Sequence, residues 1–181
     1  MFLLKTLMTL SMDKEQIRRC IATFSAVQKI LYFYSLLTLA FVSSALSADY
    51  KATSVQEIKD ALKNIQPGDN IILANGTWSD ANIVCEGKGT AEKPITLKSE
   101  TTGQVIFNGS SDLKIAGDYL IVDGLIFKGG FTQDKAIIEF RKGSKIQSNY
   151  SRLTNTAIVD YNPSNRDTSY HWVSLYGTRN R

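Results

Sequence analysis

The side chains best suited to acid–base chemistry in this sequence are four carboxylates of its second half: Asp112, Asp118, Asp123 and Glu139. Two carboxylates on one surface can act as general acid and base on a glycosidic bond, and carboxylate oxygens also bind Ca²⁺. An Asp beside a Gly, as in Asp123-Gly124, is more often a turn former whose side chain bonds the local backbone. We therefore interpret these carboxylates as corner residues rather than as a catalytic pair or a metal site.

Four basic residues, Lys128, Arg141, Lys142 and Lys145, lie near one another in the sequence. Together they could form a strip that attracts an acidic polysaccharide. Solvated charge on a β surface accounts for the same pattern, and this is the interpretation we favour.

Five further side chains have chemistry that a site could use. Trp78, Trp172 and Tyr176 could stack on sugar rings, but aromatic residues beside apolar strand positions usually fill or cover a core. The one histidine, His171, lacks an identifiable partner for general base catalysis. Cys85 lies in a β-rich stretch, where a lone cysteine is usually a small buried hydrophobe and not a nucleophile. We assign no catalytic or metal-binding role to any of these residues.

A glycine-rich stretch, Glu86-Gly87-Lys88-Gly89, has a superficial likeness to a phosphate-binding loop. It lacks the spacing Gly-x-x-x-x-Gly-Lys-Ser/Thr, and no helical pattern follows it. Charge gives no support for a nucleic acid partner either. The formal net charge is +4, but the first 48 residues hold five Lys or Arg and two acidic residues, so the remainder is close to neutral. We expect no nucleic acid partner.

Short strands must position these side chains. The central stretch, 119–130, contains two apolar runs, 119–122 and 125–127, separated by Asp123-Gly124. Similar runs occur throughout the second part of the chain, at 70–73, 83–85, 95–97, 105–107, 113–115, 136–140, 157–159 and 171–177. Short strands that recur with turn signals, without helical stretches between them, indicate a chain that coils on itself. The predicted fold class is all-β: a right-handed parallel β-helix, with 161–167 as a loop that leaves the coil.

One helix is predicted ahead of these strands, from Ser54 to about Gln66. Ser54 and Glu57 form a capping box, and Pro67-Gly68-Asp69 ends the helix. Its apolar residues recur along one face: Val55, Ile58, Leu62 and Ile65. We expect this helix to cap the open end of the β-helix, where backbone and core would otherwise meet water.

The first 48 residues have the pattern of a secretory signal peptide. Basic residues precede an apolar run, 30–48, which ends in small residues, and cleavage is expected after Ala45 or Ala48. A retained membrane anchor is the alternative, because the run approaches the length of a spanning helix. The part before the run is long for a signal, so Met8 or Met12 is a candidate start. We expect a secreted or periplasmic protein that has no membrane contact after cleavage.

Removal of this segment would also remove Cys20, so the mature chain could not form an intramolecular disulfide. The predicted domains are therefore a signal segment, 1–48, and one β-helical domain, 49–181. The 181 residues, 43% of them apolar, suffice for one such core.

Four blocks of the β-rich part follow one another in a recognisable order: Asn75-Gly76-Thr77-Trp78, 87–97, 119–130, and 172–177 with Asn180-Arg181. In this order they resemble polysaccharide lyase family six, which contains alginate lyases, named poly(β-D-mannuronate) lyases, and chondroitinase B. The resemblance extends from about Tyr50 to Arg181. It implies the same parallel β-helix that the strand pattern predicts.

The resemblance implies cleavage of an acidic uronate polymer, alginate foremost, by β-elimination. In the family a Ca²⁺ held by Asn and Glu side chains neutralises the uronate carboxylate, a Lys acts as base and an Arg as acid. These groups come from turns after the 172–177 block, and no residue here matches that motif. We therefore transfer no catalytic or metal residue, and we interpret 49–181 as the truncated N-terminal portion of such a lyase. Two alternatives stay open: a non-catalytic carbohydrate-binding or adhesion module, and an inactive relic.

Overall fold

The computed structural model describes residues 13–16, 18–19, 28, 47–132, 136–165 and 167–181. The chain divides into two units, 1–46 and 47–181. Most of the predicted signal segment lies outside the described residues, and its few described positions are largely helical. None of the described helical segments combines the length and the hydropathy needed to cross a membrane.

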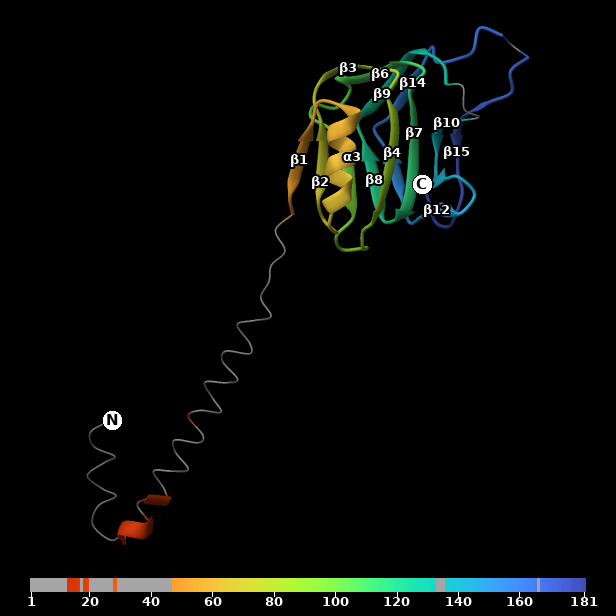
Figure 1. Cartoon of the computed structure of the whole chain (residues 1–181). Helices are drawn as coiled ribbons and strands as arrows, with labels where there is room; N and C mark the ends of the chain where they lie inside the picture. Colours follow the sequence, from red (N-terminus) through yellow and green to blue (C-terminus); the bar gives the residue numbers. More distant parts are fainter. Residues whose placement is uncertain (1–12, 17, 20–27, 29–46, 133–135, 166) are drawn as a thin grey trace. The chain divides into compact units, whose positions relative to one another are not determined.

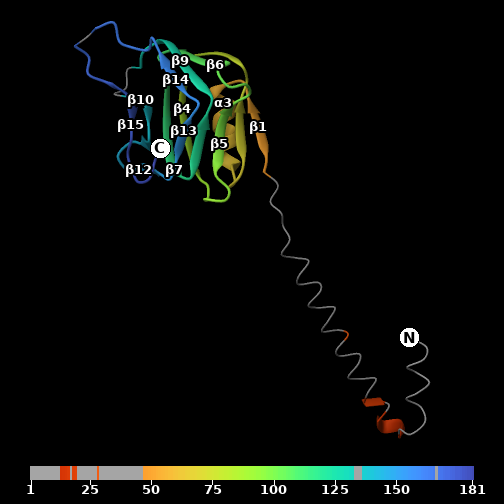
Figure 2. The same ribbon diagram turned by 180° about the vertical axis from the view of Figure 1, so that it is seen from behind.

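The second unit is a parallel β-helix, as predicted. After its first strand, the chain passes through three sheets in the same order in each of four successive turns (Figure 1). The first sheet runs, in spatial order, through β1 (Asp49–Ala52), β2 (Asn70–Leu73), β5 (Ile95–Ser99), β8 (Leu120–Asp123) and β13 (Arg152–Thr154). All of its neighbours are parallel. Figure 2 shows β1, β5 and β13 of this sheet from the opposite side.

The other two sheets complete each turn. The second sheet contains β3 (Gly76–Ser79), β6 (Val105–Gly109), β9 (Leu125–Gly130) and β14 (Ala157–Val159), all parallel. The third sheet contains β4 (Asn82–Lys88), β7 (Asp112–Asp118), β10 (Ala136–Glu139), β15 (His171–Ser174) and a short hairpin, β11 (Arg141–Lys142) with β12 (Ile146–Asn149). Because β10 and β12 both pair with β7, at different positions, the third turn is longer than the second.

The core lies inside the coil and consists of stacked side chains at equivalent positions. In the first sheet Ile71, Leu97 and Val122 are register partners, and all are fully buried. In the second sheet Phe107 lies between Trp78 and Phe127, with ring centroids 6.0 and 5.0 Å away. Alternation along each strand sends every second residue inward, so these stacks form when turns pair in register.

The helix α3 (Val55–Asn64) contacts β1 and β4 and lies over the start of the coil (Figure 1). Ile58 and Ala61 are buried against the core, which confirms the predicted capping role. Ser54 is its N-cap, and the Ser54 Oγ accepts a hydrogen bond of 3.2 Å from the Glu57 backbone N–H. The Glu57 carboxylate reaches back to the backbone N–H of Thr53 (2.6 Å), one residue earlier than an ordinary capping box.

The predicted corner at Asp123-Gly124 and the predicted loop after β14 are both present. β8 ends at Asp123 and β9 begins at Leu125. The described residues between β14 and β15 contain no strand, and this loop extends away from the coil (Figure 1). Tyr161, at the start of the loop, is fully buried, and its hydroxyl donates to the carbonyl oxygens of Gly109 (2.9 Å) and Ser111 (2.8 Å).

Several strands were not predicted from the sequence: β1, β3, the β11–β12 hairpin and β13. We expected only a turn at Asn75-Gly76, but Gly76–Ser79 is the strand β3. Each of these segments has at most two apolar residues in strand order, so its own pattern is weak. They are strands because a neighbouring turn supplies the backbone partners, and such context overrides intrinsic preference.

Candidate functional site

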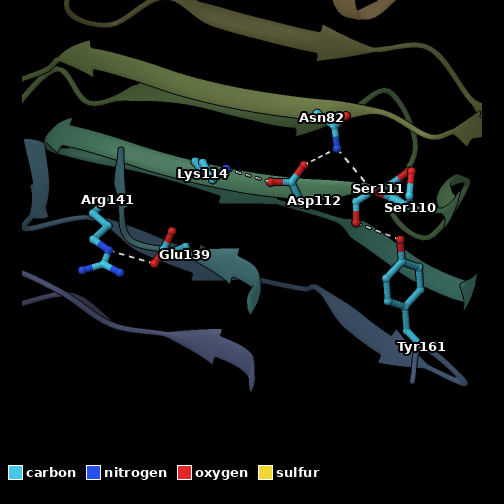
Figure 3. A network of polar contacts seen from close by, with 8 residues as sticks. All are labelled: Asn82, Ser110, Ser111, Asp112, Lys114, Glu139, Arg141 and Tyr161. Carbon is cyan, nitrogen blue, oxygen red and sulfur yellow. Dashed lines mark hydrogen bonds and ion pairs between the residues drawn. The ribbon is translucent and has the colours of Figure 1, made fainter. Parts of the chain in front are cut away.

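The outer surface of the third sheet carries four of the eight acidic and basic side chains that the sequence singled out: Asp112, Glu139, Arg141 and Lys142. Residues of β4, β7 and β10 point outward there at alternating positions. We call this surface the polar face and define it by Asn82, Glu86, Asp112, Lys114, Glu139, Arg141, Lys142 and Tyr176. Figure 3 shows part of it, with Lys114 and Asp112 on one strand and Glu139 and Arg141 beside them.

Asp112 is the buried carboxylate of this face. It is only 4% exposed, and the Asn82 side-chain amide donates to it from the paired position of β4 (Figure 3). The Lys114 ammonium lies 3.4 Å from its other oxygen. A carboxylate with these partners has a fixed orientation. Asp112 is therefore suited to fixing Asn82 and Lys114 in place.

Glu139 and Arg141 form the second pair of the face. The Arg141 Nε donates to a Glu139 carboxylate oxygen at 2.8 Å, and Glu139 is the register partner of Lys114. The Arg141 guanidinium also lies over the Tyr176 ring, with 3.7 Å between its central carbon and the ring centroid. A stacked guanidinium with a carboxylate on one edge has little rotational freedom.

Lys142 connects the hairpin to the first turn. Its ammonium lies 2.8 Å from a Glu86 carboxylate oxygen, and both side chains are substantially exposed. Exposed pairs of this kind contribute little stability. Gly87 and Lys88, which resembled part of a phosphate loop, belong to the strand β4, and no helix follows it.

The other two carboxylates lie at corners, as the sequence indicated. The Asn149 side-chain amide donates to Asp118 at 3.0 Å, and that of Asn155 donates to Asp123 at 2.7 Å. Each of the two pairs joins equivalent corners of successive turns: Asp118 and Asn149 at the corner after the third sheet, and Asp123 and Asn155 at the corner after the first. Asp118 and Asp123 therefore hold corners together and do not pair with each other.

The structure separates the four basic residues that could have formed a strip, and this agrees with the interpretation as solvated charge. Lys128 belongs to β9 in the second sheet, whereas Arg141 and Lys142 form β11 beside the third. Lys145 is exposed in the turn of the hairpin. A continuous basic strip is therefore absent from these four residues, and the cations of the polar face lie among carboxylates.

The three aromatic candidates have different environments. Trp78 is a core residue, 8% exposed, and its indole N–H donates to the Ala74 carbonyl oxygen at 3.1 Å. Trp172 is 49% exposed, and its indole N–H donates to Asn162 of the adjacent loop at 3.1 Å. Tyr176 is partly buried under Arg141. Of these three candidates, Trp172 is the one that offers a large aromatic surface to solvent.

The histidine and the cysteine lie apart from the polar face. His171 is the exposed first residue of β15. Cys85 is fully buried inside the coil, and this burial raises the pKa of its thiol to about 12. At neutral pH the thiol stays protonated and unreactive, which agrees with a small core residue.

The described carboxylates do not gather into a cluster that could hold a metal ion. No group of three or more His, Cys, Asp or Glu side chains is positioned among the described residues to hold a metal ion. The two carboxylates nearest the centre of the face, Asp112 and Glu139, are each paired with a cation. These two carboxylates do not fit a Ca²⁺ site, and we assign no step of a reaction to Ca²⁺ in this chain.

Sequence reasoning missed Asn82 and Lys114 as members of the face. Lys114 lies between the apolar residues Leu113 and Ile115 of a predicted strand, so alternation alone would have placed it outside the coil. Asn82 gave no such signal. It joins the face because β4 and β7 pair with Asn82 opposite Asp112.

Known proteins resemble this chain over its β-helical part. A family model described as chondroitinase B matches residues 52–181. The structure of AlyGC, a PL6 family alginate lyase, is 41% identical with a TM-score of 0.72, over 74% of this chain and 18% of that chain. A mannuronic acid specific family 6 lyase from human gut microbiota is 28% identical with a TM-score of 0.66, over 74% of this chain and 32% of that chain.

A PL6 family lyase from Pseudopedobacter saltans is 36% identical with a TM-score of 0.65, over 72% of this chain and 29% of that chain. No curated protein sequence matches significantly. The chain thus spans less than a third of the length of each of these solved lyases. Because the family model covers most of the chain and the matched folds agree, the chain belongs to polysaccharide lyase family six, which includes chondroitinase B and alginate lyases.

Proposed function

We propose that this chain forms the N-terminal turns of a lyase that cleaves an acidic uronate polymer, with alginate as the foremost substrate. The observation that carries the proposal is the similarity to AlyGC, a PL6 family alginate lyase, at 41% identity. The other two relatives support it, since one is a family 6 lyase specific for mannuronic acid and the other a PL6 polysaccharide lyase.

The reaction proposed for the whole enzyme is β-elimination on a uronate residue. A base removes the proton on C5, the bond between C4 and the glycosidic oxygen breaks, and that oxygen takes up a proton. The new chain end carries a double bond between C4 and C5. We assign neither the base nor the acid to this chain, because no residue of its sequence matches the catalytic motif that the family resemblance implies.

The part that we propose for these turns is binding of the polymer along the polar face. Lys114, Arg141 and Lys142 offer cationic donors on an accessible strand surface, and uronate residues carry a carboxylate each. Trp172, half exposed on the neighbouring strand β15, adds an aromatic surface on which a sugar ring could stack. A Ca²⁺ requirement is proposed only for the complete enzyme.

A non-catalytic binding or adhesion module is the second candidate. The observation in its favour is that the polar face presents Lys114, Arg141 and Lys142 on a strand surface without any residue that matches the family's catalytic motif. We also propose that the protein is secreted or periplasmic, on the basis of the N-terminal sequence pattern alone.

Two measurements on the purified full chain separate these candidates. Retardation in a gel that contains alginate reports binding, and ultraviolet absorbance reports unsaturated chain ends, with and without a Ca²⁺ chelator. We expect retardation with little or no product from these residues alone. The gene should also be sequenced past the codon for Arg181, and any longer product assayed in the same way.

Chelator-sensitive release of unsaturated sugars from a longer product would support the lyase. Retardation of every product without unsaturated ends would favour the binding module. Absence of both retardation and unsaturated product would contradict the proposal for this chain.

A further inference from the structure

Arg141 is the one cation of the polar face that is held rigidly and still presents free donors. Its Nε is occupied by Glu139 at 2.8 Å, and one face of its guanidinium is covered by the Tyr176 ring at 3.7 Å. Among the described residues, no hydrogen-bond partner is present for its two terminal amino groups, and the side chain is 31% exposed. Figure 3 shows the Arg141 Nε joined to the Glu139 carboxylate.

The edge formed by two terminal guanidinium nitrogens matches a carboxylate, which can accept one hydrogen bond on each oxygen. Lys114 and Lys142 lack this geometry, because an ammonium is a point charge on a flexible chain. Both are also engaged with carboxylates, at 3.4 and 2.8 Å respectively.

We propose that Arg141 is a specific anchor for one uronate carboxylate of the bound polymer, positioned by Glu139 and Tyr176. This inference deepens the proposed function and rests on it. The two positioning residues come from different turns, since Tyr176 follows β15 and Glu139 ends β10. The anchor therefore forms only when the third and fourth turns are stacked in register.

Net charge does not account for such recognition. The three cations of the face, Lys114, Arg141 and Lys142, are matched by three carboxylates, Asp112, Glu139 and Glu86. A polyanion gains little from the average field of a balanced surface. Binding through Arg141 must therefore come from the paired donors of its two terminal guanidinium nitrogens. A lysine ammonium at this position should be a poor substitute.

The test is titration calorimetry of the full chain with oligomannuronate, compared with Arg141→Gln, Arg141→Lys and Lys145→Gln. Lys145 is the matched control, because it is an exposed cation of the same hairpin. Loss of a charge-assisted, two-point contact should weaken affinity by about tenfold or more in Arg141→Gln. Arg141→Lys should lose most of the same affinity, and Lys145→Gln should change it less than about twofold. Circular dichroism establishes that each variant is folded.

A second probe identifies the group that Arg141 contacts. Oligomannuronate whose carboxyl groups have been reduced to alcohols should bind the native chain weakly and bind Arg141→Gln equally weakly. If the native chain binds oligomannuronate and Arg141→Gln or Arg141→Lys binds as well as the native chain, the anchor is wrong while the proposed function stands. If the native chain binds no acidic oligosaccharide, the proposed function of these turns is wrong as well.

Discussion

Equivalent positions of the coil are buried in its first three turns and partly exposed in its fourth. In the third sheet Ile83, Leu113 and Ile138 are register partners and are at most 2% exposed, whereas their partner Val173 is 39% exposed. The side chains are all branched apolar residues of similar size. The difference in burial therefore comes from the neighbours above and below, and not from the residue type.

The same contrast appears in the first sheet. Leu97 and Val122 are fully buried between adjacent turns, but Leu153 of β13 is only partly buried. In a coil of stacked turns each turn is stabilised by contacts with its neighbours, so stability is close to a sum of such interfaces. A residue's contribution to folding should therefore depend on the turn in which it lies, and substitutions can test this directly.

The largest effect is expected for Phe107→Ala in the buried aromatic stack. Phe107 is 1% exposed between Trp78 and Phe127, so truncation removes contacts on both sides and leaves a cavity. A loss of about 3–5 kcal/mol in the free energy of unfolding is expected. Urea titration followed by circular dichroism measures it.

The matched substitution in the fourth turn is Ile158→Ala. Ile158 pairs with Phe127 but is only partly buried, so its truncation should cost about 1 kcal/mol. Equal losses for Phe107→Ala and Ile158→Ala would show that the fourth turn is packed as firmly as the inner ones, contrary to the difference in burial.

The next largest effect is expected for Gly117→Ala, in the middle of the third sheet. Gly117 has φ +114°, and a Cβ there would lie 2.0 Å from the Gly87 carbonyl oxygen of the previous turn. The substitution adds backbone strain to a clash between paired strands, and a loss of about 3 kcal/mol is expected. Thermal unfolding of the variant measures it.

Gly143→Ala separates the two causes. Gly143 also has a positive φ, +61°, but a Cβ there would meet no atom within 4 Å. Strain alone should cost about 1 kcal/mol. If both variants lose the same amount, the close approach of β4 and β7 is not what requires glycine at position 117.

The sequence predicted the coil well and its register poorly. Strands with two or more inward apolar residues can be predicted from the alternation of apolar and polar residues. Ile95–Ser99 and Asp112–Asp118 are examples. β13 has a single inward apolar residue, Leu153, and forms because β8 supplies its partner. A single sequence carries little information on which residue of one turn lies opposite which residue of the next.

Prediction of the polar face from the sequence was limited for the same reason, because the register between turns was not known. Asp112 and Glu139 were interpreted as corner residues that bond the local backbone, and Arg141 as solvated charge, but their side chains form ion pairs on the face: Asp112 with Lys114, and Glu139 with Arg141. The stacking of Arg141 on Tyr176 depends on how the third turn lies on the fourth and on an unpredicted hairpin. The corner roles of Asp118 and Asp123 were predictable, because they follow from local turn chemistry.

A smaller effect is expected for Tyr161→Phe, which keeps the buried ring and removes its hydroxyl. This hydroxyl donates to the carbonyl oxygens of Gly109 and Ser111, at 2.9 and 2.8 Å. Its loss leaves buried carbonyl groups with fewer donors and should cost about 1–2 kcal/mol. Tyr150→Phe, at an exposed tyrosine, should cost less than about 0.5 kcal/mol.

The same residue gives a dependence on alkaline pH. Burial raises the pKa of Tyr161 to about 12, above the value of about 10 in an unfolded chain. The protonated form is favoured by folding, so the contribution of Tyr161 is complete below pH 10 and is lost as pH rises toward 12. The native chain should therefore lose stability more steeply between pH 10 and 12 than Tyr161→Phe. Parallel curves for the two proteins would contradict this role.

The smallest effect is expected at the start of the coil, for Ser54→Ala at the N-cap of α3. This helix covers the start of the coil, so the first turn has a neighbour on each side, whereas the fourth-turn residues Leu153 and Val173 are partly exposed. Removing the Ser54 hydroxyl leaves the Glu57 backbone N–H without its acceptor and should cost about 1 kcal/mol.

Amide hydrogen exchange in Ser54→Ala should become faster in β1 and β4, which α3 contacts, and stay unchanged in β8 and β9. Ser164→Ala, at an exposed serine of the loop, should leave every strand unaffected. Faster exchange throughout the coil in Ser54→Ala would mean that the turns unfold as one unit and that burial differences along the axis do not set local stability.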